Sequence, residues 1–187
     1  MNFNELILKR RSIRKYLDKP VSNEIVLDIL DDSIYAPSTG NEQPWKFIIV
    51  HNKVLMKKIS DHSKSTLLKR INNNPDDYAK KYQHILSKES YNIFYNAPCV
   101  VFVLGDAKLK NTKINCSFAS CYFMMSATSR GLGTCCINFA TVIESGEILN
   151  ELKIPYGYDI ITPIIIGYPD IIPGQPKREM DVLAIIE

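Results

Sequence analysis

The stretch Leu8-Lys9-Arg10-Arg11-Ser12-Ile13-Arg14-Lys15-Tyr16 places a run of basic side chains at the end of an apolar helical stripe. Upstream, Phe3, Leu6 and Ile7 recur at the spacing of one helical face, which predicts a core-facing helix that carries on to Arg10. A guanidinium taken out of water is costly unless it meets acceptors. The stretch is therefore either a solvated basic helix end or a trap for a phosphate or for the carbonyls of a planar ring.

Composition indicates one globular domain over residues 1–187. Hydrophobic residues make up 45% of the chain, charged residues 23%, and the formal net charge is only +3. Nucleic-acid-binding domains usually carry a stronger and more clustered positive charge, so we expect no nucleic-acid partner. No apolar run approaches the ~18 residues of a membrane span, and no signal peptide opens the chain, so we expect no membrane.

The cysteines and histidines predict no metal site. The 5 cysteines form no CxxC, and the 3 histidines make no ligand spacing with them. Free thiols are typical of a reducing compartment, which indicates a cytoplasmic protein. We interpret the adjacent pair Cys135-Cys136 as packing residues, since neighbouring cysteines are poorly placed to bridge.

Several further elements follow from periodicity and from turn residues. A helix capped by Ser22 is expected to run toward Pro37, and a small polar loop between Pro37 and Pro44 leads into a buried strand. That loop is either a plain connection or a stiff carrier of a site. The remaining expected elements are a strand over 98–104, a buried helix over 113–130, a short helix over 143–153 and a strand over 159–167, in which Pro163 should mark an edge or a bulge.

Residues 53–96 are polar and mostly helical. A short helix is expected near Val54–Ile59, and Asn74-Pro75-Asp76-Asp77 reads as the start of a second helix. This excursion is rich in Tyr and Lys. It could form a lid over a site or, equally, a peripheral hairpin that covers a sheet edge.

Segments 10–16 and 37–47, taken together, resemble the nitroreductase family of FMN-dependent oxidoreductases. The strand after Gly131-Leu132-Gly133 and the basic pair Lys177-Arg178 occur in the family's order. The resemblance implies an α+β fold, with a mixed four- to five-stranded sheet surrounded by helices. It also implies an intertwined homodimer that holds two FMN molecules at its interface.

The resemblance assigns roles to residues. Arg10, Ser12 and Arg14 would hold the phosphate and stabilise negative charge near N1 and the C2 carbonyl of the ring, with Arg11 beside them. Ser38 and Thr39 would touch the ring from the partner subunit, with Asn41 and Gln43 supporting their loop. The strand end at 137–139 would pass the ring, although the family usually has glycine at position 139, and the basic tail would bind the phosphate. The implied FMN-binding set is Arg10, Arg11, Ser12, Arg14, Ser38, Thr39, Asn41, Ile137, Asn138, Phe139, Lys177 and Arg178.

The implied activity is electron transfer from NADH or NADPH, through N5 of non-covalently bound FMN, to nitroaromatics, quinones or related small-molecule acceptors. No catalytic side chain is named, since water can supply the protons. Two alternatives stay open. One is a flavoenzyme of the same fold with dehalogenase, ene-reductase or flavin-reductase chemistry, and the other is a flavin-binding protein without turnover.

Overall fold

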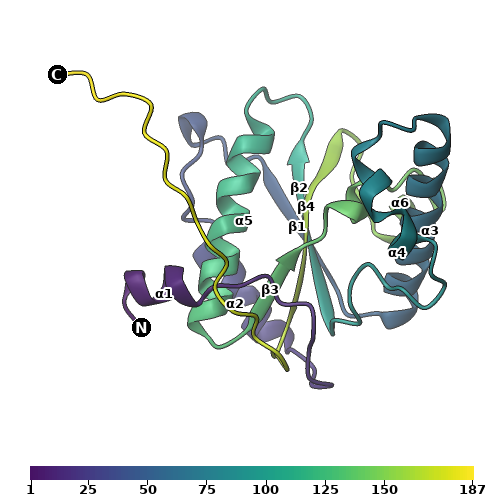
Figure 1. The fold of residues 1–187 in the computed structure, drawn as a ribbon, viewed down its shortest axis with the longest axis horizontal. Helices are drawn as coiled ribbons and strands as arrows, with labels where there is room; N and C mark the ends of the chain where they lie inside the picture. Colours follow the sequence, from purple (N-terminus) through teal and green to yellow (C-terminus); the bar gives the residue numbers. More distant parts are fainter.

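The computed structural model describes residues 1–187 and shows a four-stranded sheet with helices on both faces (Figure 1). The strands are β1 (Trp45–Val50), β2 (Cys99–Asp106), β3 (Gly133–Cys136) and β4 (Tyr158–Gly167), in the order β1-β2-β4-β3. All three strand pairs are antiparallel, and a parallel bridge between Ser12 and Thr134 adds the mixed character. The α+β architecture expected from the sequence is thereby confirmed.

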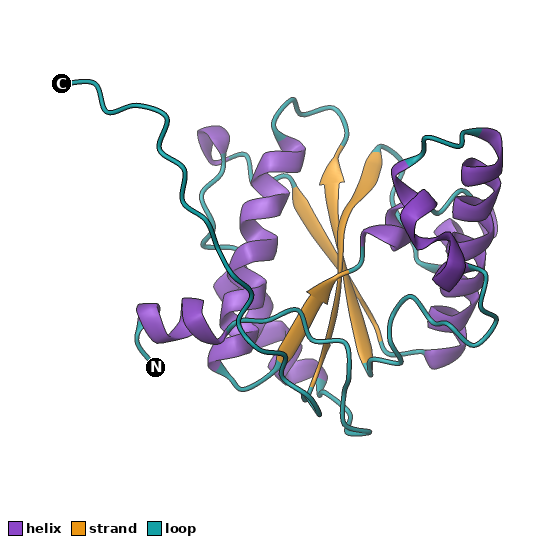
Figure 2. Cartoon of the chain, viewed as in Figure 1, coloured by secondary structure: helices purple, strands orange, loops and turns teal.

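Helices cover both faces of this sheet (Figure 2), and a hydrophobic core lies between the sheet and the helices on each face. One packs under α3 (Lys53–Asn73), and the other packs under α2 (Asn23–Ser33) and α5 (Thr112–Ser129). The central strand β2 is buried along nearly its whole length, as its unbroken apolar run predicted. None of the helices is long and apolar enough to cross a bilayer.

Helices α2 and α5 form where their sequence patterns indicate. The Ser22 side chain accepts a hydrogen bond from the Ile25 N–H, and Gly131, at φ 75°, follows the end of α5. The buried side of α5, however, is the side with small residues, such as Ala119 and Ser126. Ile114 and Phe118 on its other side are exposed in the single chain.

Two predictions about the N-terminal helix are wrong. Helix α1 (Phe3–Lys9) contains no buried residue, and the Phe3 side chain is 70% exposed. The helix ends at Lys9, before the basic segment, because residues 10–16 take an extended course along the sheet. The apolar stripe of α1 therefore has no core to face within this chain.

The excursion over 53–96 also differs from expectation. The first helix, α3, runs for 21 residues rather than forming a short helix. Asn74 does not cap a second long helix. Instead, Asp77 caps a short 3-10 turn, η2 (Tyr78–Tyr82), which leads into the single turn α4 (Gln83–Leu86). The helix over 143–153 is likewise shorter, as α6 (Gly146–Glu151).

Pro163 lies in the inner strand β4, so the expectation of an edge is wrong; β4 does contain a bulge, but it lies at Ile161, two residues before the proline. Pro163 faces Phe102 of β2, and the register between these strands shifts at Val103/Leu104. A proline has no N–H to donate to the ladder, and Pro163 takes part through its carbonyl oxygen, which accepts from the Ile137 N–H at 2.8 Å.

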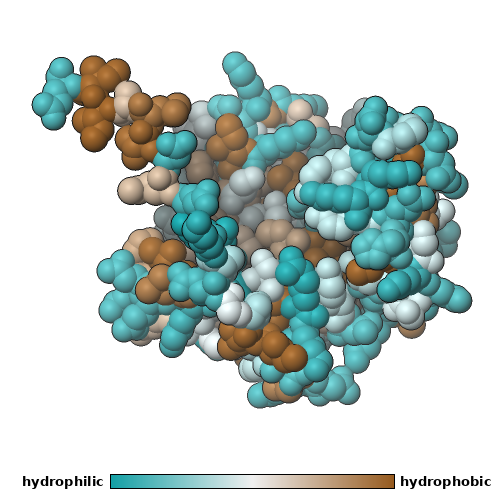
Figure 3. All heavy atoms as spheres, in the orientation of Figure 1, coloured by the Kyte–Doolittle hydropathy of each residue, from teal (hydrophilic) through white to brown (hydrophobic).

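Residues 15–17, near the N-terminus, lie beside residues 168–170, which follow β4. The Leu17 N–H donates to the Tyr168 carbonyl at 2.9 Å, and the Asp170 N–H donates to the Lys15 carbonyl at 3.0 Å. Beyond this point, residues 171–187 are exposed and have no helix or strand. Figure 3 shows apolar side chains at the end of this tail, which projects away from the molecule.

Candidate functional site

The basic segment is held along β3 by its backbone. The Ile13 N–H donates to the Thr134 carbonyl at 2.9 Å, and Ser12 forms a parallel bridge with Thr134. In an extended chain, successive side chains point to opposite faces. Ile13 is buried at 2% exposure, so Ser12 and its neighbours two residues away, Arg10 and Arg14, face the other side together.

The Cys135 thiol shows where these three side chains converge. Burial raises the pKa of this thiol, while Arg14, Ser12 and Arg10 act in the opposite direction. Two guanidinium groups and a hydroxyl are therefore close enough to one sulfur atom to influence its ionisation. This arrangement favours an anion at the same place, because guanidinium forks bind phosphate and carbonyl oxygens in defined directions.

A cavity of about 300 Å³ opens beside Arg14. Its floor is the end of β3 and the residues that follow, Cys135 to Phe139. Its walls come from the helical excursion, and ten of its lining residues are hydrophobic. The remaining lining residues are Tyr78, Tyr82, His84, Ile85, Tyr91, Ile93 and Tyr95. A mostly apolar cleft with a cation at its rim suits a planar ring that carries polar edges.

Of the basic cluster, Arg11 is turned away from this cavity. It lines a second cavity, of about 540 Å³, together with Lys9 and Ile13, and its guanidinium donates to the Arg10 carbonyl at 2.6 Å. The alternation of an extended chain explains this separation, since Arg11 stands one residue out of phase with Arg10 and Arg14.

The loop with Ser38, Thr39 and Asn41 lies at the N-terminal end of α5, and it does not line the Arg14 cavity. Asn115 of α5 accepts hydrogen bonds from the Thr39 N–H at 3.2 Å and from its hydroxyl at 3.4 Å. Asn41 has a left-handed backbone at φ 55°. A loop held in such a conformation is typical of functional sites.

The tail cations are not gathered into the site within one chain. Lys177 and Arg178 are exposed, and Lys177 pairs with Glu179 at 3.2 Å. Neither residue lines the Arg14 cavity or the Arg11 cavity. Of the predicted residues, Arg14 and the strand end 137–139 line the cavity, whereas Arg10 and Ser12 lie near the Cys135 thiol without lining it.

Reasoning from the sequence missed the aromatic wall of the cavity. The Tyr82 and Phe139 rings meet edge to face at 5.2 Å, and the Tyr91 and Tyr95 rings do so at 5.8 Å. The Arg14 guanidinium lies 5.8 Å from the centre of the Tyr95 ring. The only sequence signal was the abundance of tyrosine in 53–96, and it did not say which tyrosines face the site.

Comparisons with known proteins agree with this geometry. A model of the nitroreductase family matches residues 7–168. A protein from Archaeoglobus fulgidus, named as an NADH dehydrogenase/NAD(P)H nitroreductase, is 29% identical over 88% of this chain and 84% of its own length. An iodotyrosine deiodinase from Thermotoga neapolitana is 23% identical over 95% of each chain. A Bacteroides fragilis nitroreductase, solved with bound FMN, superposes with a TM-score of 0.84 over 100% of both chains at 24% identity, which shows a shared fold.

Proposed function

The chain belongs to the nitroreductase family, and from that premise we propose that it is an FMN-dependent NAD(P)H oxidoreductase acting on nitroaromatic, quinone or related acceptors. The observation that carries this proposal is that Arg10, Ser12 and Arg14 gather around the Cys135 thiol, and that Arg14 and Cys135 line a largely apolar cavity. This donor set fits a mononucleotide, which combines a phosphate with a planar ring that carries carbonyl groups.

Each residue of the site has a task in this proposal. When bound, FMN supplies the electron transfer from nicotinamide to acceptor. Arg10 and Ser12 would bind the phosphate, and Arg14 would supply a positive charge to stabilise the reduced ring. The backbone at Ile137–Phe139 supports the ring, and the Tyr82–Phe139 pair excludes water from it.

We propose that the working unit is a homodimer. In one chain, part of the predicted FMN-binding set lies away from the cavity, and apolar side chains are left exposed. Ser38 and Thr39 would reach the ring of the partner subunit, since they do not line the cavity of their own chain. Apolar side chains are exposed on α1 and α5, among them Phe3, Ile7 and Phe118. Because α1 and α5 are in contact, we propose that these exposed apolar side chains form one interface.

The tail supports the same proposal. Leu183 is 95% exposed, and Val182, Ile185 and Ile186 are also exposed. Apolar and β-branched residues in an extended segment are suited to strand pairing, and β1 lies at an edge of the sheet. We propose that the tail covers the partner subunit and brings Lys177 and Arg178 to a phosphate there.

The test is the visible spectrum of the purified protein, followed by anaerobic titration with NADH and with NADPH. We expect a yellow protein that one or both nicotinamides bleach, and whose colour returns when a nitroaromatic or a quinone is added. A colourless protein that does not take up added FMN would contradict the proposal.

Reductive dehalogenation is a second candidate, favoured by the similarity to the Thermotoga deiodinase and by the tyrosine-rich cavity wall. Reoxidation of the reduced protein by a halotyrosine, with release of halide but no reaction with nitroaromatics, would support it. A yellow protein that neither nicotinamide bleaches would instead support flavin binding without turnover.

A further inference from the structure

The turn that carries Tyr95 has an unusual backbone. Tyr95 and Asn96 are consecutive, and both have left-handed conformations, with φ values of 52° and 55°. Residues with a side chain rarely adopt this region, and such a conformation persists only where the surroundings hold it. Two such residues in a row therefore indicate a turn whose shape serves a purpose.

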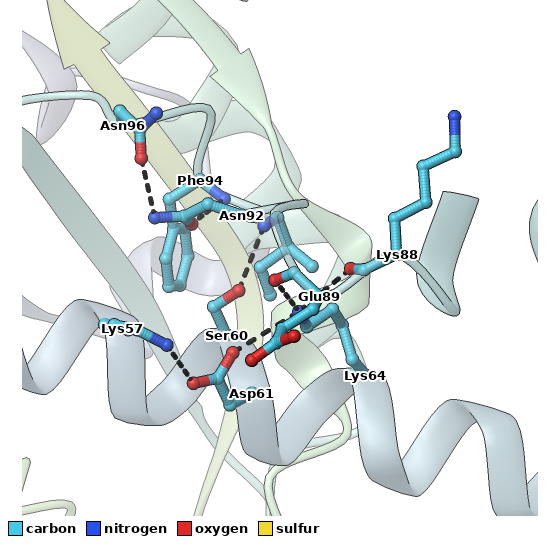
Figure 4. A network of polar contacts seen from close by, with 10 residues as sticks. Lys57, Ser60, Asp61, Lys64, Lys88, Glu89, Asn92, Phe94 and Asn96 are labelled. Atoms are coloured by element: carbon cyan, nitrogen blue, oxygen red, sulfur yellow. Dashed lines mark hydrogen bonds and ion pairs between the residues drawn. The ribbon is translucent and has the colours of Figure 1, made fainter.

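A polar network holds this turn against α3 (Figure 4). The Asn92 carboxamide accepts from the Phe94 N–H at 2.8 Å and donates to the Asn96 side chain at 3.0 Å. From α3, the Ser60 hydroxyl accepts from the Ile93 N–H at 3.1 Å. Ile93 and Phe94, the two residues directly before Tyr95, are fully buried. The turn is therefore held by packing as well as by these hydrogen bonds.

Lys64 adds a second anchor from the same helix. It is buried, and its ammonium group donates to the carbonyl oxygens of Lys88 at 3.4 Å and Glu89 at 3.2 Å. It also pairs with Asp61 at 3.3 Å, as Figure 4 shows. Burying an ammonium group costs free energy unless hydrogen-bond acceptors surround it. The Lys64 contacts therefore hold the carbonyl groups of Lys88 and Glu89, just before Tyr91, in place.

The anchored turn presents Tyr95 to Arg14. The guanidinium carbon of Arg14 lies 5.8 Å from the centre of the Tyr95 ring, within the range of a cation–π contact. The Tyr91 hydroxyl donates to the Tyr95 hydroxyl at 3.2 Å and so steadies the ring from the other side. Burial raises the pKa of Tyr91, which keeps this phenol protonated and able to donate.

Arg14 also interacts with the Cys135 thiol, but it has no charged partner. No carboxylate lies within ion-pair distance of its guanidinium, and the side chain is exposed. A long side chain without such a partner samples several rotamers, and it loses conformational entropy when it is fixed in one of them. The Tyr95 ring supplies a flat surface that limits this freedom.

We propose that Tyr95 is a positioning residue, which holds the Arg14 guanidinium over the cavity and thereby tunes the reduction potential of the flavin. The proposal rests on the proposed function, since it presumes FMN beside Arg14. An ordered positive charge stabilises the reduced, more negative ring better than a mobile one, because no reorganisation is needed when the charge appears. The wild-type arrangement therefore raises the potential.

The test compares the two-electron midpoint potentials of FMN bound to the wild type, to Tyr95→Leu and to Tyr95→Phe. We expect Tyr95→Leu to lose about tenfold in the preference for reduced over oxidised FMN, which corresponds to a potential lower by about 30 mV. Tyr95→Phe keeps the ring, so its potential should stay near that of the wild type. Tyr156→Leu is the matched control, because Tyr156 is fully exposed and lies outside this cavity.

Two further variants separate positioning from general damage. Lys64→Met loosens the turn without touching the cavity, and it should lower the potential in the same direction. In an Arg14→Gln background, Tyr95→Leu should change the potential no further, since the residue acts through Arg14. In protein without cofactor, the NMR resonance of the Arg14 Nε–H group should lose its ring-current shift in Tyr95→Leu.

The outcomes are distinguishable. A wild type that binds no FMN overturns both this proposal and the proposed function. A wild type that binds FMN, with unchanged potentials in Tyr95→Leu and in Lys64→Met, overturns only the role of Tyr95. A potential that falls equally in the Arg14→Gln background would also overturn it.

Discussion

The backbone N–H of Ile13 donates to the carbonyl oxygen of Thr134 at 2.9 Å, and this contact joins the N-terminal segment to β3. The bond sets which side of the segment faces the core and which faces the cavity. Arg10, Ser12 and Arg14 share the cavity side as a consequence. The site therefore depends on a register between two segments that are far apart in the sequence.

Gly133→Ala should disturb that register. A Cβ atom at this position would lie 2.5 Å from Ile13 Cγ1 and 2.8 Å from Ile13 Cβ, and Ile13 is buried and unable to withdraw. We expect a loss of about 1–3 kcal/mol in the free energy of unfolding, together with weaker FMN binding. Urea denaturation and flavin fluorescence measure the two effects. Gly146→Ala is the control, because nothing lies within 4 Å of its Cβ position, and an equal loss there would contradict the argument.

Arg14→Gln should weaken FMN binding far more than Arg11→Gln. Arg14 lines the cavity beside 137–139, whereas Arg11 lines the other cavity. Hydrogen bonds to charged groups are worth about 1.5–3 kcal/mol, so we expect a loss of about tenfold to a hundredfold in affinity for Arg14→Gln. Equilibrium titration of the cofactor-free variants with FMN provides the measurement. Equal losses in the two variants would show that the alternation of side chains does not govern the site.

Two sets of tail variants should separate the roles of the C-terminal segment. Changing Lys177 and Arg178 to Gln should weaken FMN binding while the dimer persists. Changing Leu183 and Ile185 to Ser should dissociate the dimer, because both apolar side chains are exposed in the single chain. Light scattering reports the mass, and flavin titration reports the affinity. A wild type that is monomeric at micromolar concentration would refute the role of the apolar tail.

Asn115→Ala should loosen the loop that carries Thr39. The Asn115 side chain is 1% exposed, and its carbonyl oxygen accepts two hydrogen bonds from Thr39. Thr39 is exposed, so its donors can turn to water, and the loss of stability should stay near the net value of a hydrogen bond, about 0.5–1.5 kcal/mol, while the loosened loop lowers the FMN affinity. Asn115→Asp keeps the acceptor for Thr39 and should retain more of the affinity. If Asn115→Ala binds FMN as tightly as the wild type does, the loop does not need this anchor.

The buried thiols should make stability fall at alkaline pH. Burial raises the pKa of the Cys99 thiol to about 12, and burial likewise raises the pKa of the Cys116 thiol to about 11. An unfolded cysteine ionises above about pH 8.5, whereas the folded thiols stay protonated there. Ionisation therefore stabilises the unfolded state relative to the folded state. The free energy of unfolding should therefore fall as the pH rises from about 9 toward 11, by up to about 1.4 kcal/mol per pH unit for each thiol.

Urea denaturation at a series of pH values, under reducing conditions, measures that slope. Cys99→Val should flatten the pH dependence, and the comparison uses the slope because the substitution also changes the packing at pH 8. Cys121→Ser is the control, because Cys121 is exposed. A wild-type slope that persists unchanged in Cys99→Val would exclude this thiol as its source.

Local patterns in the sequence determined much of the architecture. The apolar run of β2, the Ser22 cap of α2 and the position of α5 all follow from residues that are neighbours in the chain. The chemistry of the basic segment could also be predicted, because guanidinium groups and a hydroxyl need acceptors wherever the chain puts them. These features depend on periodicity and side-chain type, which the sequence carries directly.

The assembly of the site depends on contacts that form only when the chain folds. The basic segment became extended rather than helical because β3 offered it a backbone partner at Thr134, and that choice turned Arg11 away from Arg14. Tyr95 reached Arg14 because α3 anchors a turn that no periodicity describes. Such contacts join residues that are distant in the chain, and their geometry is set by hydrogen bonds and packing that exist only once the sheet and its helices have come together.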